Sequence, residues 1–298
     1  MMLKNFGQME QFVREQSGKK RVALAAAHDA DALGSLMMAV DRGIAEAILI
    51  GRRKEIVRVL DEMGKDAGDF RIIEEEDDRA ADKAVELVHC GEADMPMKGL
   101  MHTSTFMKAI LDKEKGLKED GNLLSQASVF EIPEKDRFLI ISDCAVNIDP
   151  DLETKIKITE NAAALAHTLG IEQPKIAVLS AVEVVNPKIR STVDAAAMRE
   201  RLSDRYLIDG PLALDNAIDE AAAHHKGIES PVAGNADILI VPDLWSGNIF
   251  SKGLVFFAHL RSAGTLNGLK APVVMSSRTD TVENKYLSIL TAVLQTIR

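Results

Sequence analysis

Short apolar runs alternate with longer amphipathic stretches along almost the whole chain, and this alternation constrains the fold more than any other feature. Short runs rich in apolar and β-branched residues predict strands, whereas apolar residues that recur at helical spacing predict helices. Strands that alternate with helices form largely parallel sheets, so the pattern predicts an α/β fold. The expected strands are 21–27, 45–50, 70–73, 127–132, 138–142, 175–180, 238–241 and 272–275, and the expected helices are 32–43, 53–63, 77–90, 104 to about 115, 152–169, 192–202 and 214–225.

The length of the chain predicts more than one core. At 298 residues, the chain exceeds the size at which one hydrophobic core usually stops growing, so two domains or one large α/β unit are expected. No linker rich in proline, glycine or serine divides the sequence. The best candidate for a short crossing between domains is therefore the segment 131–136.

Composition argues against several classes of protein. No run of about 18 uninterrupted apolar residues is present, so no membrane-spanning helix is expected. The apolar run 22–27 is too short for a secretory signal, and the cysteines, Cys90 and Cys144, lack metal-type spacing. A cytoplasmic protein with two free thiols is therefore expected. The net charge of −10, without a basic cluster beside stacking aromatics, argues against a nucleic-acid partner.

The segment after the last expected strand is the most informative one for function. A Ser-Arg pair, Ser277 and Arg278, follows strand 272–275 closely, and a helix comes next. Open α/β sheets bind ligands at the carboxyl ends of their strands, where helix N-termini offer N–H groups to an anion. The planar fork of an arginine suits phosphate. The simpler alternative is that Arg278 pairs with a nearby carboxylate, Asp280 or Glu283.

Polar residues also follow the strand at 238–241. Gly247 allows close approach of a ligand, and the amide of Asn248 can hold a carbonyl or phosphate oxygen. Asp243 is equally suited to cap the helix that follows, and Lys252 to be an ordinary surface lysine. These alternatives stay open on the sequence alone.

A third segment, 209–217, reads as a turn that leads into a helix. Asp209 is expected to shape the turn, and Pro211 lies near the expected first helical position.

In the first half of the chain, the segment 97–103 carries the strongest local signal. Lys98 supplies a cation, Gly99 flexibility, His102 a titratable ring and Thr103 a hydroxyl, just ahead of an expected helix. A phosphate needs such a set of donors. The alternative is an exposed loop with an incidental histidine.

Standard signatures of several enzyme classes are absent. The chain has no G-x-G-x-x-G, Walker loop, G-x-S-x-G or H-E-x-x-H, which counts against nucleotide-dependent redox enzymes, ATPases, esterases and proteases. His28 and Asp29 resemble metal-ligand material, but no further cluster is spaced to complete a site, so no metal is expected. Asp29 or Asp31 is instead expected to cap the helix that follows.

Taken in this order, these segments resemble the phosphate acyltransferase family, and especially its phosphate butyryltransferase branch. The resemblance runs from about residue 21 to 298, and its most specific parts are the Ser-Arg tail, the strings 209–217 and 237–248, and a Lys-Gly-x-x-His-Thr run at 98–103. It assigns phosphate or substrate binding to Lys98, Gly99, His102, Thr103, Asp143, Asn147, Ser180, Asp209, Pro211, Asp243, Gly247, Asn248 and Lys252, and catalysis to Ser277, Arg278, Asp280 and Glu283.

The resemblance implies two α/β domains with a cleft between them, like the isocitrate and isopropylmalate dehydrogenases. On that basis we expect residues 1–136 with 265–298 to form the first domain, and 137–264 the second. It also implies that a short-chain acyl group moves reversibly between coenzyme A and inorganic phosphate. Coenzyme A is then a substrate and no cofactor is permanently bound, acyl-CoA and phosphate are the partners, and a homodimer is expected.

The reaction that the resemblance implies needs a thiolate, a phosphate held still and donors for the oxyanion at the acyl carbonyl. Arg278 would neutralise the phosphate or stabilise the tetrahedral intermediate, and Ser277 would form a hydrogen bond with the reacting carbonyl or thiol. Lys98, His102 and Thr103 would help to hold the phosphate.

One position departs from the family pattern. Acetyl-specific members carry an aspartate six residues after the arginine, proposed as the base for the thiol, whereas this chain has Asn284. Asp280, Glu283 and His102 remain as candidates for the base, and the change favours the butyryltransferase branch. The open alternatives are a phosphate acetyltransferase, a non-catalytic acyl-CoA-binding paralogue, and a dehydrogenase on the same scaffold, which would need a metal-binding aspartate cluster that the sequence does not present.

Overall fold

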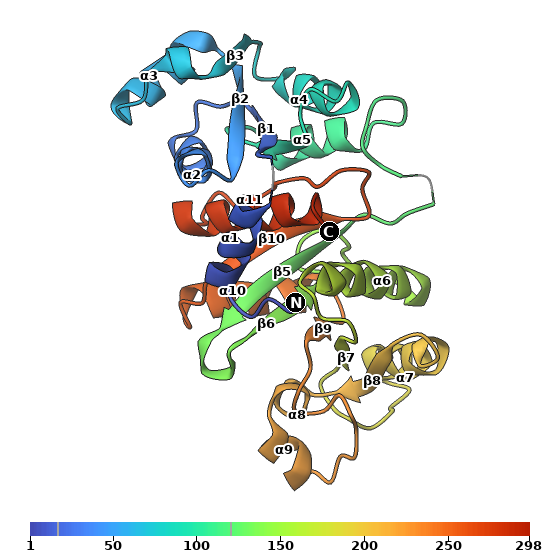
Figure 1. Ribbon diagram of the computed structural model, residues 1–298. Helices are drawn as coiled ribbons and strands as arrows, with labels where there is room; N and C mark the ends of the chain where they lie inside the picture. Colours follow the sequence, from blue (N-terminus) through green and yellow to red (C-terminus); the bar gives the residue numbers. More distant parts are fainter. Residues whose placement is uncertain (17, 120) are drawn as a thin grey trace. The chain divides into compact units, whose positions relative to one another are not determined.

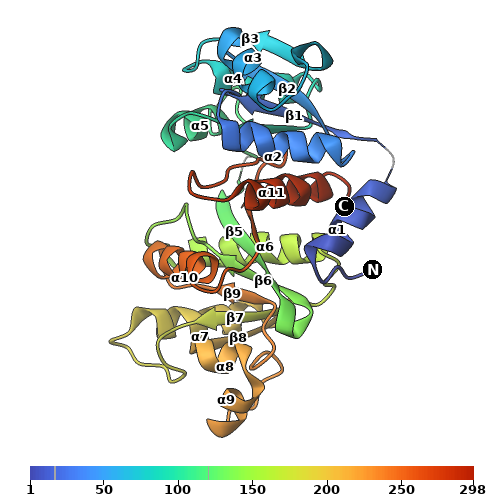
Figure 2. The same cartoon turned by 90° about the vertical axis from the view of Figure 1, so that its left-hand side faces the viewer.

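The computed structural model describes residues 1–16, 18–119 and 121–298, and they form two compact units. Unit 1 comprises Met1–Asn5 and Leu123–Ser262, and unit 2 comprises Phe6–Asn122 and Ala263–Arg298. Each unit combines helices with a β-sheet (Figures 1 and 2). These limits differ from the expected division at residues 136 and 264. Residues 123–136 lie in unit 1 because β5 (Ser125–Ile132) pairs there with β6 (Arg137–Ser142) as an antiparallel hairpin.

Unit 2 is built on a parallel sheet of four strands in the order β3-β2-β1-β4. Beyond β4, Val274 pairs in parallel with Met97, and Val273 pairs with Leu266 in the antiparallel sense. The four strands of this sheet are β1 (Lys20–Ala25), β2 (Ala45–Gly51), β3 (Arg71–Glu74) and β4 (Met95–Lys98). The chain returns from unit 1 through β10 (Ser262–Asn267), which is not part of this sheet. The helices are α1 (Phe6–Glu15), α2 (Ala30–Asp41), α3 (Arg53–Glu62), η1 (Ala67–Asp69), α4 (Ala80–His89), α5 (Thr103–Ile110) and α11 (Val282–Gln295).

The elements of unit 2 form for local reasons that the sequence carries. The second half of β1, Val22–Ala25, is fully buried, as expected for a central parallel strand covered on both faces. Asp29 caps α2, as expected, and its Oδ1 accepts from the amides of Asp31 and Ala32 at 3.0 Å each. Helix α2 packs on β2 and α11, and α4 packs on β1, β4 and α5.

Unit 1 contains strands in the order β5-β6-β9-β7-β8, in which β5 is antiparallel to β6 and the others are parallel. Its further strands are β7 (Lys175–Leu179), β8 (Leu207–Leu212) and β9 (Ile238–Ile240). Its helices are η2 (Pro133–Lys135), α6 (Leu152–Thr168), α7 (Arg190–Leu202), α8 (Leu214–Ile218), α9 (Glu220–His225) and α10 (Leu244–Phe256).

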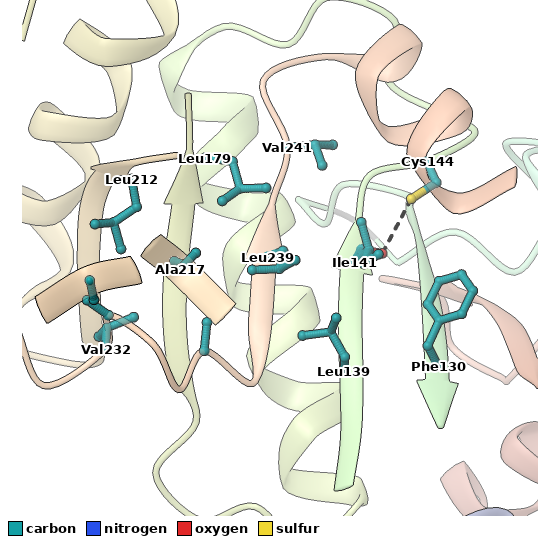
Figure 3. Close-up of a cluster of buried hydrophobic side chains, with 14 residues drawn as sticks. Phe130, Leu139, Ile141, Cys144, Leu179, Leu212, Ala217, Val232, Leu239 and Val241 are labelled. Carbon is teal, nitrogen blue, oxygen red and sulfur yellow. Dashed lines mark hydrogen bonds between the residues drawn. The ribbon is translucent and has the colours of Figure 1, made fainter. Parts of the chain in front are cut away.

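One hydrophobic cluster of unit 1 is shown in Figure 3. Leu139 and Ile141 of β6, Leu239 of β9 and Leu179 of β7 are at most 8% exposed, and Phe250 of α10 packs against them. Each such side chain contributes about 1.5–3 kcal/mol by leaving water. This cluster packs the middle and end of α10 onto the sheet of unit 1.

The expected α/β fold with parallel sheets is confirmed, but some elements differ from the pattern. Strands β4, β8 and β10 were not expected, and the helix expected over 214–225 is divided at Asp219. The helix expected to run to about 115 ends at Ile110, because the carboxylate of Asp112 accepts the amides of Glu114 and Lys115 and turns the chain. Within the residues described, no helix is long and apolar enough to cross a membrane.

Candidate active site

The carboxyl edge of the unit 2 sheet brings two candidate segments together. The amide of Lys98 donates to the carbonyl of Val274, and the amide of Val274 donates to the carbonyl of Pro96, both at 3.0 Å. The expected strand 272–275 forms only isolated bridges, but its bridge to β4 is parallel, so the residues that follow both segments emerge at the same edge. The segment after β4 and the Ser277–Arg278 pair are therefore neighbours, although nearly 180 residues separate them in the sequence.

Gly99 lets the chain cross the end of β1 closely. Its amide donates to the carbonyl of Ala25 at 2.9 Å. A Cβ at this position would lie 2.4 Å from the carbonyl oxygen of Ala26 and 2.5 Å from that of Ala25. Both obstacles are backbone atoms, so only glycine fits, and the crossing fixes where Lys98 and the start of α5 lie.

Lys98 is a buried cation. It is 6% exposed, and the hydrogen bond that its Nζ makes is a long one, 3.4 Å, to the carbonyl of Gly99. Burial lowers the pKa of the Lys98 amine, and the positive charges of Arg278 and Lys285 lower it further, whereas Asp29 acts in the opposite direction. The ammonium form is thus held in a place where charge is costly, which favours an anionic ligand beside it.

Arg278 contacts His102 at this edge. Arg278 Nη2 lies 3.4 Å from His102 Nδ1, and since a guanidinium only donates, Nδ1 is the acceptor. His102 occupies the N-cap position of α5, and Thr103 is the first residue of that helix. The first amides of a helix have no intrahelical partner, so this corner offers N–H donors as well as cations.

The loop that carries Arg278 is held by its own polar residues. The amide of Ser277 donates to Asp280 Oδ2 at 2.7 Å, and Ser277 Oγ lies 3.1 Å from Thr279 Oγ1. Lys285 Nζ donates to the carbonyl of Asp280. Asp280 therefore shapes the loop from within, and Lys285, which no sequence pattern singled out, fastens it to α11.

The two remaining positions of this segment lie in the first turn of α11. Glu283 is exposed, whereas Asn284 is 7% exposed and its backbone N–H donates to Thr281 Oγ1 at 3.1 Å. Asn284, which stands where acetyl-specific members carry an aspartate, is thus buried at the start of the helix.

A second charged group at the same edge was missed by sequence reasoning. Arg52 Nη2 lies 3.3 Å from His28 Nε2 and 3.1 Å from Asp77 Oδ2, and the His28 side chain is 6% exposed. The three residues follow β1, β2 and β3, far apart in the sequence. Only the strand order brings them together, so their spacing alone gives no signal.

In unit 1, Asp143 organises the loop after β6. It is 3% exposed, and its carboxylate accepts from the amides of Ala145 and Val146 at 2.8 and 3.0 Å and from Asn147 Nδ2 at 2.6 Å. Asn147 Nδ2 also donates to the carbonyl of Leu124. Both predicted residues thus lie together, each hydrogen-bonded within the loop.

The start of α10 packs against this loop, because β6 and β9 are neighbouring parallel strands. Asp243 caps α10, with its Oδ1 2.8 Å from the amide of Ser246, so the capping alternative is confirmed. A Cβ on Gly247 would lie 2.6 Å from the carbonyl oxygen of Asp143, and Asn248 Nδ2 donates to the carbonyl of Cys144 at 3.1 Å. Lys252 lies farther along the helix and is exposed.

The cysteine in this loop is not a candidate nucleophile. Burial raises the pKa of the Cys144 thiol far above neutrality, and its Sγ lies 3.5 Å from the carbonyl of Ile141 (Figure 3). A thiol that stays protonated is a poor nucleophile.

The remaining predicted residues of unit 1 lie on β7 and β8. Ser180 follows β7 and shares a 2.8 Å hydrogen bond with Ser191. Asp209 lies within β8, where it pairs with Arg199 of α7 at 3.3 Å, and Pro211 lies in the same strand. The expectation that 209–217 forms a turn into a helix was wrong up to Leu212, because β8 is an edge strand and such a strand tolerates proline.

Comparisons with known proteins point to one family. The sequence profile described as Phosphate acetyl/butaryl transferase matches residues 78–293. The chain is 46% identical to a phosphate butyryltransferase of Clostridium acetobutylicum, over 98% of both chains. It is 42% identical to a phosphate acetyltransferase of Thermotoga maritima, over 94% of this chain and 97% of that one.

A similar solved structure points to the same family. The chain is similar to a branched-chain phosphotransacylase from Enterococcus faecalis, with a TM-score of 0.84 and 33% identity, over 93% of this chain and 98% of that one. The family profile, at residues 78–293, includes every candidate residue from Lys98 to Glu283. The chain belongs to the phosphate acetyl/butaryl transferase family.

Proposed function

We propose that the protein moves a short-chain acyl group, butyryl or a close relative, reversibly between coenzyme A and inorganic phosphate. The observation that carries the proposal is the pair of cations at one sheet edge, where buried Lys98 lies next to Arg278 beside the start of α5. Phosphate carries two negative charges near neutral pH, so such a corner holds it well. The names of the relatives support the same reaction.

In this proposal, Arg278 neutralises the phosphate, and Lys98, His102 and Thr103 help to hold it. Ser277 donates to the acyl carbonyl, because its hydroxyl lies in the loop next to Arg278. A phosphate that is held still and a carbonyl that is polarised together supply orientation and charge stabilisation, which are the main needs of acyl transfer. That the predicted residues of unit 1 contact a ligand stays a prediction.

Preference for butyryl over acetyl groups rests on Asn284. Both a butyryltransferase and an acetyltransferase are among the relatives, so likeness alone does not select a chain length. Asn284 cannot serve as the carboxylate base of the acetyl-specific pattern. A phosphate acetyltransferase therefore remains the second candidate.

Several finer features are part of the same proposal. Coenzyme A acts as a substrate and no cofactor is permanently bound, nucleic acid is not a partner, and the protein works in the cytoplasm. The likeness of the two-domain arrangement to the isocitrate and isopropylmalate dehydrogenases also remains a proposal. Two chains are proposed to form a homodimer, for which sedimentation would give twice the 32.5 kDa of one chain.

The test is release of free thiol from acetyl-CoA, butyryl-CoA and isobutyryl-CoA, with and without phosphate. Strict phosphate dependence and the highest kcat/KM with a four-carbon group are expected. Faster turnover of acetyl-CoA would overturn the preference inferred from Asn284. Coenzyme A binding without any thiol release would favour a non-catalytic acyl-CoA-binding protein.

A further inference from the structure

Acyl transfer from an acyl phosphate to coenzyme A requires a group that takes the proton of the thiol. Of the three candidates from the sequence, Glu283 is exposed on the first turn of α11, and the other two are engaged otherwise. Asp280 accepts the amide of Ser277 at 2.7 Å, and its backbone carbonyl accepts from Lys285. His102 Nδ1 accepts from Arg278, so its remaining ring nitrogen carries the proton when the ring is neutral. An imidazole in that state has no free lone pair to offer.

Lys98 has the features that these groups lack. It is buried at the end of β4, and no carboxylate of the described residues lies within ion-pair distance of its Nζ. The hydrogen bond from its Nζ to the carbonyl of Gly99 is long, 3.4 Å, so the nitrogen is available to a ligand. Its backbone amide donates a hydrogen bond to the carbonyl of Val274, which places Lys98 beside the loop of Ser277 and Arg278.

The charged groups around Lys98 come from three directions. Arg278 lies in the loop after Val274, Lys285 on α11, and Asp29 at the start of α2. Two of these charges are positive and one is negative, and burial acts with the positive ones, so the pKa of the amine is lowered. His102, also at this edge, is turned to Arg278. A lysine in such surroundings can act as a base, whereas an arginine cannot.

We propose that Lys98 is the proton carrier of the reaction, which rests on the proposed function. In the direction of acyl-CoA, neutral Lys98 Nζ takes the proton of the thiol. The thiolate sulfur then bonds to the acyl carbon, and the bond from that carbon to the phosphate oxygen breaks. The departing phosphate keeps the electron pair and receives the proton from Lys98, leaving as HPO₄²⁻. In reverse, HPO₄²⁻ gives its proton to Lys98 and its oxygen bonds to the acyl carbon. The bond from that carbon to sulfur breaks, and the departing thiolate receives the proton from Lys98.

The first test is Lys98→Arg, which keeps a positive charge and several donors but cannot lose a proton at working pH. Because a positioned base contributes about 10²–10⁴-fold, kcat should fall at least about 100-fold, while the KM for acyl phosphate changes less than about threefold. If Lys98 only held phosphate, the variant would keep most of its kcat. Retention of more than a tenth of kcat would therefore overturn the proposal.

A second test covers the case in which arginine does not fit the buried site. Lys98→Cys, in a Cys90→Ser background that removes the exposed thiol, is alkylated with 2-bromoethylamine to give an amine less basic than lysine. The proposal predicts that activity returns and that the acidic limb of the kcat profile moves to lower pH than in the Cys90→Ser parent. Returned activity with an unmoved limb would show that only the charge matters.

The two hypotheses fail in distinguishable ways. Phosphate-dependent thiol release by the Cys90→Ser parent tests the proposed function, and it must be present before either Lys98 variant is interpreted. A parent without this activity overturns the proposed function and this inference with it. An active parent with an active Lys98→Arg variant overturns this inference alone. Circular dichroism and coenzyme A binding check that each variant is folded.

Discussion

Arg278 and Lys98 place two basic side chains at one edge of a sheet, with His102 against the first of them. A charged group stabilises the transition state most when it is already oriented before the reaction begins. The contact from Arg278 to His102 and the internal bonds of the Ser277 loop supply that orientation. Residue-scale changes here should therefore act on the reaction more than on folding.

Arg278→Ala should lower kcat/KM by more than tenfold, a loss above about 1.4 kcal/mol of transition-state stabilisation. Arg278→Lys should also lose at least tenfold, because an ammonium keeps the charge but not the planar fork. Thiol-release kinetics measure both. Arg58→Ala, which removes an exposed arginine paired with Glu62 on α3, is the control and should stay within twofold. Full activity of Arg278→Ala would contradict the role given to this residue.

Gly99→Ala should destabilise unit 2 and reduce activity together. The new methyl would press on the backbone oxygens of Ala25 and Ala26, and overpacking of this kind costs about 1–3 kcal/mol or more. Urea denaturation measures the loss. Gly253→Ala on α10 is the matched control, since a Cβ there meets nothing and alanine favours a helix by about 1 kcal/mol. Equal stabilities of the two variants would argue against the close crossing.

At this scale, the structure brings several of the predicted residues together, and their roles stay predictions. Lys98, Gly99, His102 and Arg278 are neighbours, as the resemblance implied. Lys285 was not predicted, because a lysine inside a helical pattern reads as a surface residue. The group of Arg52, His28 and Asp77 was also missed, since only the order β3-β2-β1 places the ends of those strands side by side.

Among the elements, periodicity predicted strands with continuous apolar runs, such as β1 and β2, to within one or two residues. It missed β4 and β8, whose sequences Met95–Lys98 and Leu207–Leu212 contain proline, charge or glycine. The place of a strand in its sheet explains such a sequence. Strand β8 lies at a sheet edge, and Gly210 is needed because a Cβ would lie 2.8 Å from the carbonyl oxygen of Val178. Tertiary pairing of this kind is invisible to a local pattern.

Two helices of unit 1 are joined by a buried ion pair that should matter for stability. Lys155 of α6 and Asp194 of α7 are 2.7 Å apart, with side chains 5% and 13% exposed. Asp194→Asn leaves the lysine charge buried and unpaired, so the free energy of unfolding should fall by about 3 kcal/mol, measured in urea, while kcat/KM stays within about twofold. The double variant Lys155→Met/Asp194→Leu should recover most of the loss. A cost below about 1 kcal/mol for Asp194→Asn would contradict the buried pair.

Taken as a whole molecule, the chain carries a net charge of −10, yet its proposed substrates are anions. Long-range charge therefore does not draw them in, and local cations at a sheet edge must hold them. The family likeness extends over both units, so fold and reaction class follow from the sequence as a whole. Acyl-chain length does not follow, because it depends on the depth of a pocket that no sequence pattern specifies.

The most direct test of acyl transfer to phosphate is the stoichiometry of its two products. Purified protein is given butyryl-CoA and phosphate, free thiol is counted, and acyl phosphate is trapped with hydroxylamine as the hydroxamate. One hydroxamate for each thiol is expected, and neither product should form at an appreciable rate without phosphate or with Arg278→Ala. Thiol release without hydroxamate would mean that water accepts the acyl group, and would contradict the proposed function.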